Sequence, residues 1–184
     1  MTLVMPINRI MMLPKQIFTL LKPLVCFLSL FLSGAVQGQI EYNWQNSKEG
    51  WVPGKDCKLI AQNESMAMLS FHEYPVMRSG TLNENLGIDA SEYNLVTITL
   101  NNPTKTNGNA NARLFVYPPS SNDAMCYYNF LVDTSMSSFS TYTIALDSPP
   151  TSGIYEGTIA RFGLRGPFGV NNGDTIYWKS MVVS

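Results

Sequence analysis

The sequence has few of the residues that enzyme and metal sites most often require. It contains one histidine, His72, and three cysteines. A serine or cysteine nucleophile needs a basic partner within hydrogen-bonding reach, and a structural zinc site needs four ligands. One histidine with Cys57 and Cys126 supplies neither set, and we expect His72 at or near the surface of a strand. No phosphate-binding glycine loop is present either. We therefore predict that the protein is not an enzyme.

The first 38 residues have the pattern of a secretory signal peptide. Three basic residues precede the apolar run Leu24–Leu32, and small residues follow up to Gly38. A basic start, an apolar centre and a small-residue exit are typical of export signals. The apolar run is about half as long as the ~20 residues of a membrane-spanning helix. We therefore predict a cleaved leader over residues 1–38 and one secreted domain, extracellular or periplasmic, over residues 39–184.

Positive charge is scarce in residues 39–184. Removing the three basic residues of the leader from a total of 12 leaves nine, against 13 Asp and Glu, a net charge near −4. Surfaces that bind nucleic acids or anionic membranes need clustered lysine and arginine. We therefore expect neither a nucleic acid nor a membrane as a partner of the mature chain.

Helical periodicity is also nearly absent from the mature chain, because no long segment places apolar residues at three-and-four spacing. Short runs that alternate between apolar and polar residues, typical of half-buried strands, are separated by clusters of Asn, Gly, Pro and Ser. The expected strands are residues 39–45, 57–62, 66–72, 76–80, 95–101, 112–117, 125–132, 140–146, 158–165 and 175–183. This pattern predicts an all-β antiparallel sandwich or barrel. We also expect one helical turn at residues 89–92 and a bulge at Lys179-Ser180.

One of these strands has an outward face that solvent exposure alone does not require. Arg113, Phe115 and Tyr117 alternate with aliphatic residues, so a cation lies between two rings on one side of the strand. On a later strand, Arg161 and Arg165 share the side opposite its apolar residues. We expect the fold to present this face to a ligand.

The motifs of the mature chain resemble a known family. They are Trp44, Glu49-Gly50-Trp51, Gly87–Tyr93 before a Val-Thr-Ile-Thr strand, Ala112–Tyr117, Tyr142-Thr-Ile, Ile159–Arg165 and an apolar C-terminal strand. Together they resemble the galactose-binding-like jelly rolls of secreted bacterial polysaccharide-processing proteins, many of which are carbohydrate-binding modules. The resemblance implies two stacked antiparallel sheets, with a concave sheet face that binds glycans and often a structural calcium away from that face.

The residue types needed for sugar binding are present on the expected strands. Rings stack on the C–H faces of sugars, and planar polar side chains satisfy the hydroxyl groups. The candidate ligand-binding residues are Arg113, Tyr117, Arg161, Arg165, Tyr128 and Trp178. The pattern leaves open which way Tyr128 and Trp178 face. It also leaves open the alternative that the arginines form surface ion pairs, which contribute little. Trp44 and Trp51 are expected to plug the end of the sandwich.

Two features of the chain leave alternatives open. The last strand reads Trp178–Met181 where the family often has Ile-Asp-x-Ile, and Lys179 is no ligand for a hard cation. We expect no cofactor, with a structural calcium, held in part by Glu41 and Asp174, as the alternative. Cys57 and Cys126 either pair in an oxidising compartment or stay as thiols.

These observations predict a secreted, non-catalytic module that binds a polysaccharide or another glycan. The alternatives are a structural or adhesive sandwich that binds a protein, and a small polysaccharide-active enzyme. The enzyme alternative needs two carboxylates at a defined separation, and no pair of Asp or Glu residues is favoured by its spacing.

Overall fold

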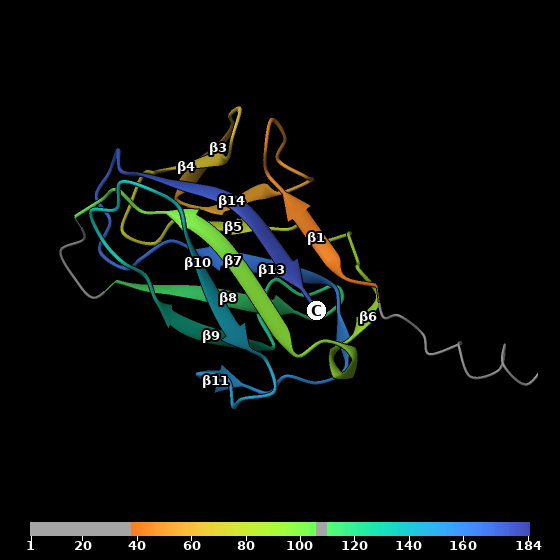
Figure 1. Ribbon diagram of the computed structural model, residues 1–184. Coiled ribbons are helices and arrows are strands. Elements are labelled where there is room, and N and C mark those ends of the chain that lie inside the picture. Colours follow the sequence, from red (N-terminus) through yellow and green to blue (C-terminus); the bar gives the residue numbers. More distant parts are fainter. Residues whose placement is uncertain (1–37, 106–109) are drawn as a thin grey trace, which may run out of the picture. The chain divides into compact units, whose positions relative to one another are not determined.

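The computed structural model describes residues 38–105 and 110–184 (Figure 1). Residues 1–37, which hold nearly all of the predicted leader, lie outside the described residues. The described part of the chain consists of strands, turns and one short 3-10 helix, η1 (Ala90–Glu92), at the expected helical turn. No helix in these ranges is long and apolar enough to cross a membrane.

Most strands belong to two six-stranded sheets. The first sheet has the order β10-β7-β14-β4-β3, with β1 also paired to β14. Its strands are β1 (Ile40–Asn43), β3 (Cys57–Ala61), β4 (Met66–Ser70), β7 (Leu95–Asn101), β10 (Ser140–Ala145) and β14 (Thr175–Val183). The second sheet has the order β11-β9-β8-β13-β5-β2. Its strands are β2 (Val52–Lys55), β5 (Val76–Arg78), β8 (Asn111–Tyr117), β9 (Cys126–Leu131), β11 (Ser152–Gly153) and β13 (Arg161–Arg165).

A short separate ladder joins β6 (Ile88–Asp89) to β12 (Thr158–Ile159). Strand pairs in all three sheets are antiparallel. The chain is therefore an antiparallel β-sandwich of the jelly-roll type, as the sequence predicted.

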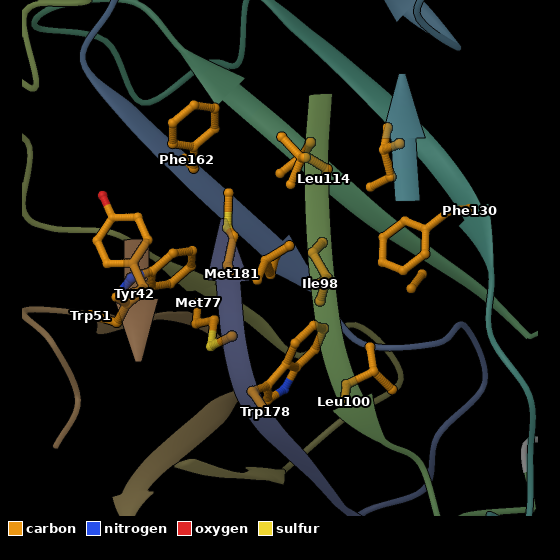
Figure 2. Packing of buried hydrophobic residues seen from close by; sticks show 14 of the residues in the cluster. Tyr42, Trp51, Met77, Ile98, Leu100, Leu114, Phe130, Phe162, Trp178 and Met181 are labelled. Atoms are coloured by element: carbon orange, nitrogen blue, oxygen red, sulfur yellow. The ribbon is translucent and has the colours of Figure 1, made fainter. Parts of the chain in front are cut away.

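The core lies between the two large sheets and follows the alternation of the sequence. Ile98 and Leu100 of β7 are fully buried, and Leu114 of β8 is fully buried on the facing sheet. Figure 2 shows these side chains with Phe162 and Trp178 in one cluster drawn from both sheets. Burial of such side chains is the main force that holds the two layers together.

Two departures from regular strand structure have clear causes. In β14 the register against β7 shifts between Trp178 and Ser180, which confirms the bulge predicted there. Strand β2 was not predicted, because Pro53 and Gly54 are strand breakers. It forms the last strand in the order of its sheet, where a missing N–H is tolerated.

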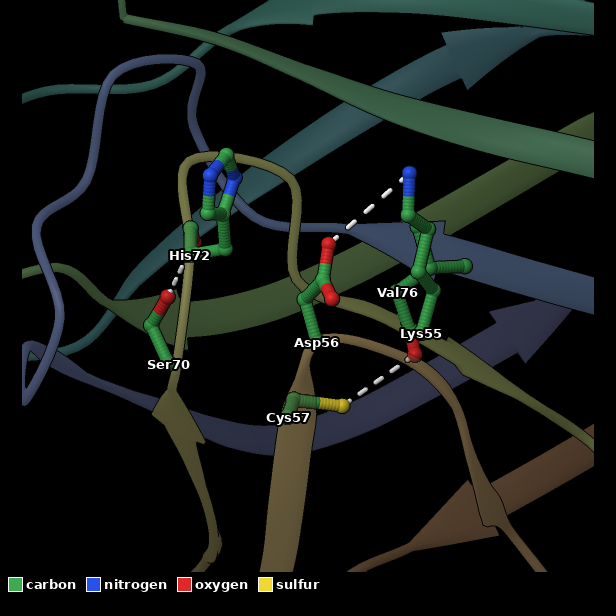
Figure 3. A network of polar contacts seen from close by, with 6 residues as sticks. All are labelled: Lys55, Asp56, Cys57, Ser70, His72 and Val76. Carbon is green, nitrogen blue, oxygen red and sulfur yellow. Dashed lines mark hydrogen bonds and ion pairs between the residues drawn. The ribbon is translucent and has the colours of Figure 1, made fainter.

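The two cysteines that the structure describes are unpaired and buried, Cys57 on the first sheet and Cys126 on the second. The Cys57 thiol donates a hydrogen bond to the Val76 carbonyl over 3.1 Å, close to the turn that carries exposed His72 (Figure 3). Burial raises the pKa of each thiol to about 11. Of the two alternatives left open by the sequence, the structure has the free thiols.

We therefore expect both cysteines to resist alkylation while the protein is folded. The thiolate is the reactive form, and with these pKa values only about one thiol in a thousand is ionised at pH 8. Mass spectrometry after iodoacetamide treatment should show no adduct on folded protein and one adduct per cysteine in guanidinium. The variant Cys57→Ser should lose one adduct in denaturant. Denatured protein that reacts only after reduction would instead reveal a disulfide.

Candidate functional site

The outer face of the second sheet carries all four arginines of the described residues: Arg78, Arg113, Arg161 and Arg165. On β8 and β13 these side chains alternate with core residues such as Leu114. Arg165 is paired directly with Arg113, and Arg78 with Gly163. The predicted cationic face of one sheet therefore exists, and it includes Arg78, which was not among the predicted site residues.

Arg113 is held in place by β9. Its guanidinium carbon lies 3.7 Å from the centre of the Tyr127 ring and 5.5 Å from that of Phe115. Its Nε donates a hydrogen bond to Asn129 Oδ1 over 2.8 Å. Contact with a ring face stabilises a cation, so the orientation of Arg113 is set before any ligand arrives.

Tyr117 and Arg161 lie on the predicted face but are closed off from solvent. Tyr117 is 3% exposed and Arg161 is 1% exposed. The guanidinium carbons of Arg78 and Arg161 each lie 5.2 Å from the centre of the Tyr117 ring, and Arg161 also donates a hydrogen bond to the Ser121 carbonyl. The prediction that Tyr117 and Arg161 contact a ligand is wrong for this structure, because both side chains are buried, Tyr117 against two guanidinium groups and Arg161 against the segment that follows β8.

The prediction that Tyr128 and Trp178 bind the ligand is also wrong, because both residues belong to the core cluster. Tyr128 is in step with Cys126, and its hydroxyl donates a hydrogen bond to the Leu146 carbonyl over 2.8 Å. Burial raises the pKa of Tyr128 to about 12. Trp178 is fully buried, since the register shift of β14 comes after it and leaves it in step with Ile176.

Arg113 and Arg165 line an open cleft of about 390 Å³. The other lining residues are Tyr74, Asn111, Asn129 and Phe168. The half-exposed rings of Tyr74 and Phe168 meet edge to face, with their centres 5.1 Å apart. Among the residues that the structure describes, no carboxylate and no histidine lines this cleft. We call it the arginine cleft.

Arg165 forms the floor of the arginine cleft and is 7% exposed. One of its terminal nitrogens donates a hydrogen bond to the Asn111 carbonyl over 3.1 Å, whereas its buried Nε has no partner. The backbone N–H of Phe168 donates to the same carbonyl over 3.0 Å, which ties the loop to the sheet. Burial, and next the charge of Arg113, lower the pKa of Arg165 to about 10.

Four residues of this site were missed in the sequence for two different reasons. Strict alternation from Cys126 places Tyr127 and Asn129 on the outer face, and this signal was available. Tyr74 and Phe168 come from turns, where no periodicity indicates which way a side chain points.

The absence of a cofactor stays a prediction, and so does its alternative, a structural calcium. No group of three or more His, Cys, Asp or Glu side chains that could hold a metal occurs in the described part of the chain. Asp174 accepts hydrogen bonds from the backbone N–H of Asn171 over 2.7 Å and from its side-chain amide over 3.3 Å. This carboxylate thus stabilises its own turn.

Comparison with solved structures supports the assignment of the fold. No family model and no curated protein matches the chain. Among solved structures, arabinose-bound MgGH51 α-L-arabinofuranosidase matches with a TM-score of 0.56 and 11% identity over 82% of this chain and 27% of that one. PfGH50B matches with a TM-score of 0.50 and 14% identity over 77% of this chain and 23% of that one. The resemblance predicted from the sequence is confirmed at the level of the fold.

A smaller protein is similar over most of its length. It is a low-affinity xylan-binding module, CBM86, from Roseburia intestinalis, with a TM-score of 0.49 and 16% identity over 80% of this chain and 95% of that one. In contrast, the chain spans only about a quarter of the arabinofuranosidase and of PfGH50B. The function of this chain therefore has to be argued from its own side chains.

Proposed function

We propose that this protein is an exported, non-catalytic carbohydrate-binding module that holds a polysaccharide in the arginine cleft. The observation that carries the proposal is the combination of two half-exposed rings, Tyr74 and Phe168, with the guanidinium and amide groups of Arg113, Arg165 and Asn129. Export rests on the leader pattern of the sequence.

The lining of the cleft matches what a sugar requires. The rings offer flat apolar surfaces for the C–H face of a pyranose, which buries apolar area on both partners. Arginine and asparagine side chains donate hydrogen bonds to the hydroxyl groups that leave water. Arg113 is already oriented by Tyr127 and Asn129, so little side-chain entropy is lost on binding.

The same lining supports a binding role without catalysis. Glycoside hydrolysis needs a pair of carboxylic groups on either side of the scissile bond. The residues described around the arginine cleft contain guanidinium, amide, phenol and phenyl groups, and none of them is a general acid or base suited to neutral pH.

Replacing Phe168 by alanine is expected to weaken polysaccharide binding by about tenfold, because a stacking surface is lost. Affinity electrophoresis in gels that contain xylan, mixed-linkage glucan or polygalacturonate measures this as reduced retardation. The matched control is Phe139→Ala, in a separate cleft of about 560 Å³ that also contains Tyr177. Thermal melting checks that both variants are folded.

Two results would count against the proposal. Retardation that Phe139→Ala removes and Phe168→Ala leaves intact would move the glycan to the other cleft. The absence of retardation by every polysaccharide in the panel would reject carbohydrate binding.

A further inference from the structure

Two arginines of the cleft face each other without a counter-charge. Arg113 of β8 and Arg165 of β13 are directly opposite in the ladder. Like charges in this position destabilise a sheet. The structure adds a second cost, because Arg165 is 7% exposed and its Nε is buried without a hydrogen-bond partner. A buried cation normally has a carboxylate beside it.

Acidic residues outnumber basic ones in the chain, but no acidic side chain that the structure describes forms an ion pair with Arg113 or Arg165. The mature chain carries 13 Asp and Glu against nine Lys and Arg. In the described ranges, the one ion pair joins Lys55 to Asp56 over 3.8 Å. The local excess of positive charge is therefore a property of the arginine cleft in an otherwise acidic domain.

The other two arginines of the face do not share this opening. Arg78 and Arg161 both contact the Tyr117 ring, and the hydrogen bond from Arg161 to the Ser121 carbonyl keeps it under the segment after β8. Arg161 is 1% exposed. The site for a ligand is consequently limited to Arg113 and Arg165.

We propose that the arginine cleft recognises an acidic polysaccharide, with the carboxylate or sulfate group of one sugar held by Arg113 and Arg165. This inference rests on the carbohydrate-binding function proposed above and names its ligand class. An oxyanion here supplies the missing counter-charge, and guanidinium groups match the geometry of such anions. The rings of Tyr74 and Phe168, next to the two arginines, then contact the sugar that carries the anion.

The first experiment compares polymers of different charge by affinity electrophoresis of the protein. The panel contains polygalacturonate for carboxylates, carrageenan for sulfates, and mixed-linkage glucan and xylan as weakly charged or neutral polymers. Retardation by polygalacturonate or carrageenan but not by the glucan supports the inference, and the two acidic polymers distinguish the anion. Raising the salt from about 0.05 to 0.5 M should weaken that retardation, because screening acts on charge contacts.

The outcomes separate this inference from the proposal on which it rests. Equal retardation by neutral and acidic polymers overturns the acidic ligand while carbohydrate binding stands. Retardation by none of the polymers overturns both.

The second experiment tests the assigned residue. Arg113→Gln is expected to weaken binding of polygalacturonate, or of carrageenan if that is the polymer bound, by about 10–100-fold, because a charge-assisted contact is lost. Lys58→Gln removes the same charge from an exposed position on β3 and should leave affinity unchanged. Equal weakening by both variants would mean attraction by net charge alone and would overturn the site. Melting curves of both variants show whether the fold is kept.

Discussion

Methionine in place of Arg165 is expected to stabilise the protein and to abolish binding of its polysaccharide. In the folded state the Arg165 guanidinium is almost fully buried, opposite Arg113 and without a carboxylate. Methionine fills similar space without a charge to desolvate. Loss of the hydrogen bond to the Asn111 carbonyl offsets part of the gain. We expect a net increase of about 1–2 kcal/mol in the free energy of unfolding.

The pH dependence of this gain follows from the pKa of Arg165. The folded protein lowers the pKa to about 10, so folding disfavours the charged form that the unfolded chain keeps. The resulting loss of stability is fully present below pH 10 and fades as the pH rises above that value. Arg165→Met should therefore raise the melting temperature in full at pH 7.

A matched control and a contrary result complete this test. Lys58→Met replaces an exposed cation on β3 and should change neither the melting temperature nor binding. A lower melting temperature for Arg165→Met would show that Arg165 is retained for structure, through its bond to Asn111, and not for a ligand. Differential scanning fluorimetry and affinity electrophoresis on the same samples measure both effects.

Residues that destabilise a fold are often kept because a ligand needs them. The arginine cleft fits this description, since the opposed arginines and the unpartnered Nε of Arg165 lie in one place. An acidic sugar would remove both costs at once. Stability and binding are thus expected to change in opposite directions at Arg165.

The strands could be predicted wherever side chains alternate between core and outer face. β7 and β14 have the bounds expected from the sequence, and β8 differs by one residue at its start. The same alternation correctly placed Arg113 and Arg165 on the outer face. Strand β2 escaped prediction because Pro53 and Gly54 disfavour a strand locally, and only its pairing with β5 makes it one.

The site could be predicted only in part, because facing outward does not ensure contact with solvent. Arg161 and Tyr117 face outward from their strands, yet the segment containing Ser121 contacts Arg161, and the guanidinium groups of Arg78 and Arg161 lie against the Tyr117 ring. These contacts are tertiary features, with no local signal in β8 or β13. Phe168, in contrast, lies in a loop and was not predicted, yet it lines the arginine cleft. A hydrogen bond from its backbone N–H to the Asn111 carbonyl holds it there.

Replacing Trp51 by alanine is expected to cause the largest loss of stability, about 3–5 kcal/mol. Trp51 is 1% exposed and packs edge to face against Trp44, with ring centres 5.1 Å apart, and against Tyr42 at 5.3 Å. Tyr42 lies on β1 of the first sheet, whereas Trp51 directly precedes β2 of the second. The cluster therefore joins the two layers, as expected for the end of the sandwich.

Chemical denaturation measures this loss. The control is an alanine substitution at Phe71, whose side chain is 51% exposed. Phe71→Ala should cost less than about 1 kcal/mol, because little apolar area is lost there. Equal costs for the two substitutions would show that the Trp51 cluster does not hold the layers together. Because Trp51 is not among the residues of the arginine cleft, Trp51→Ala protein that remains folded should still bind its polysaccharide. Trp51→Ala is thus expected to lose stability and keep binding, whereas Arg165→Met is expected to lose binding and keep or gain stability. Together the two results would separate residues that stabilise the sandwich from residues that bind the ligand.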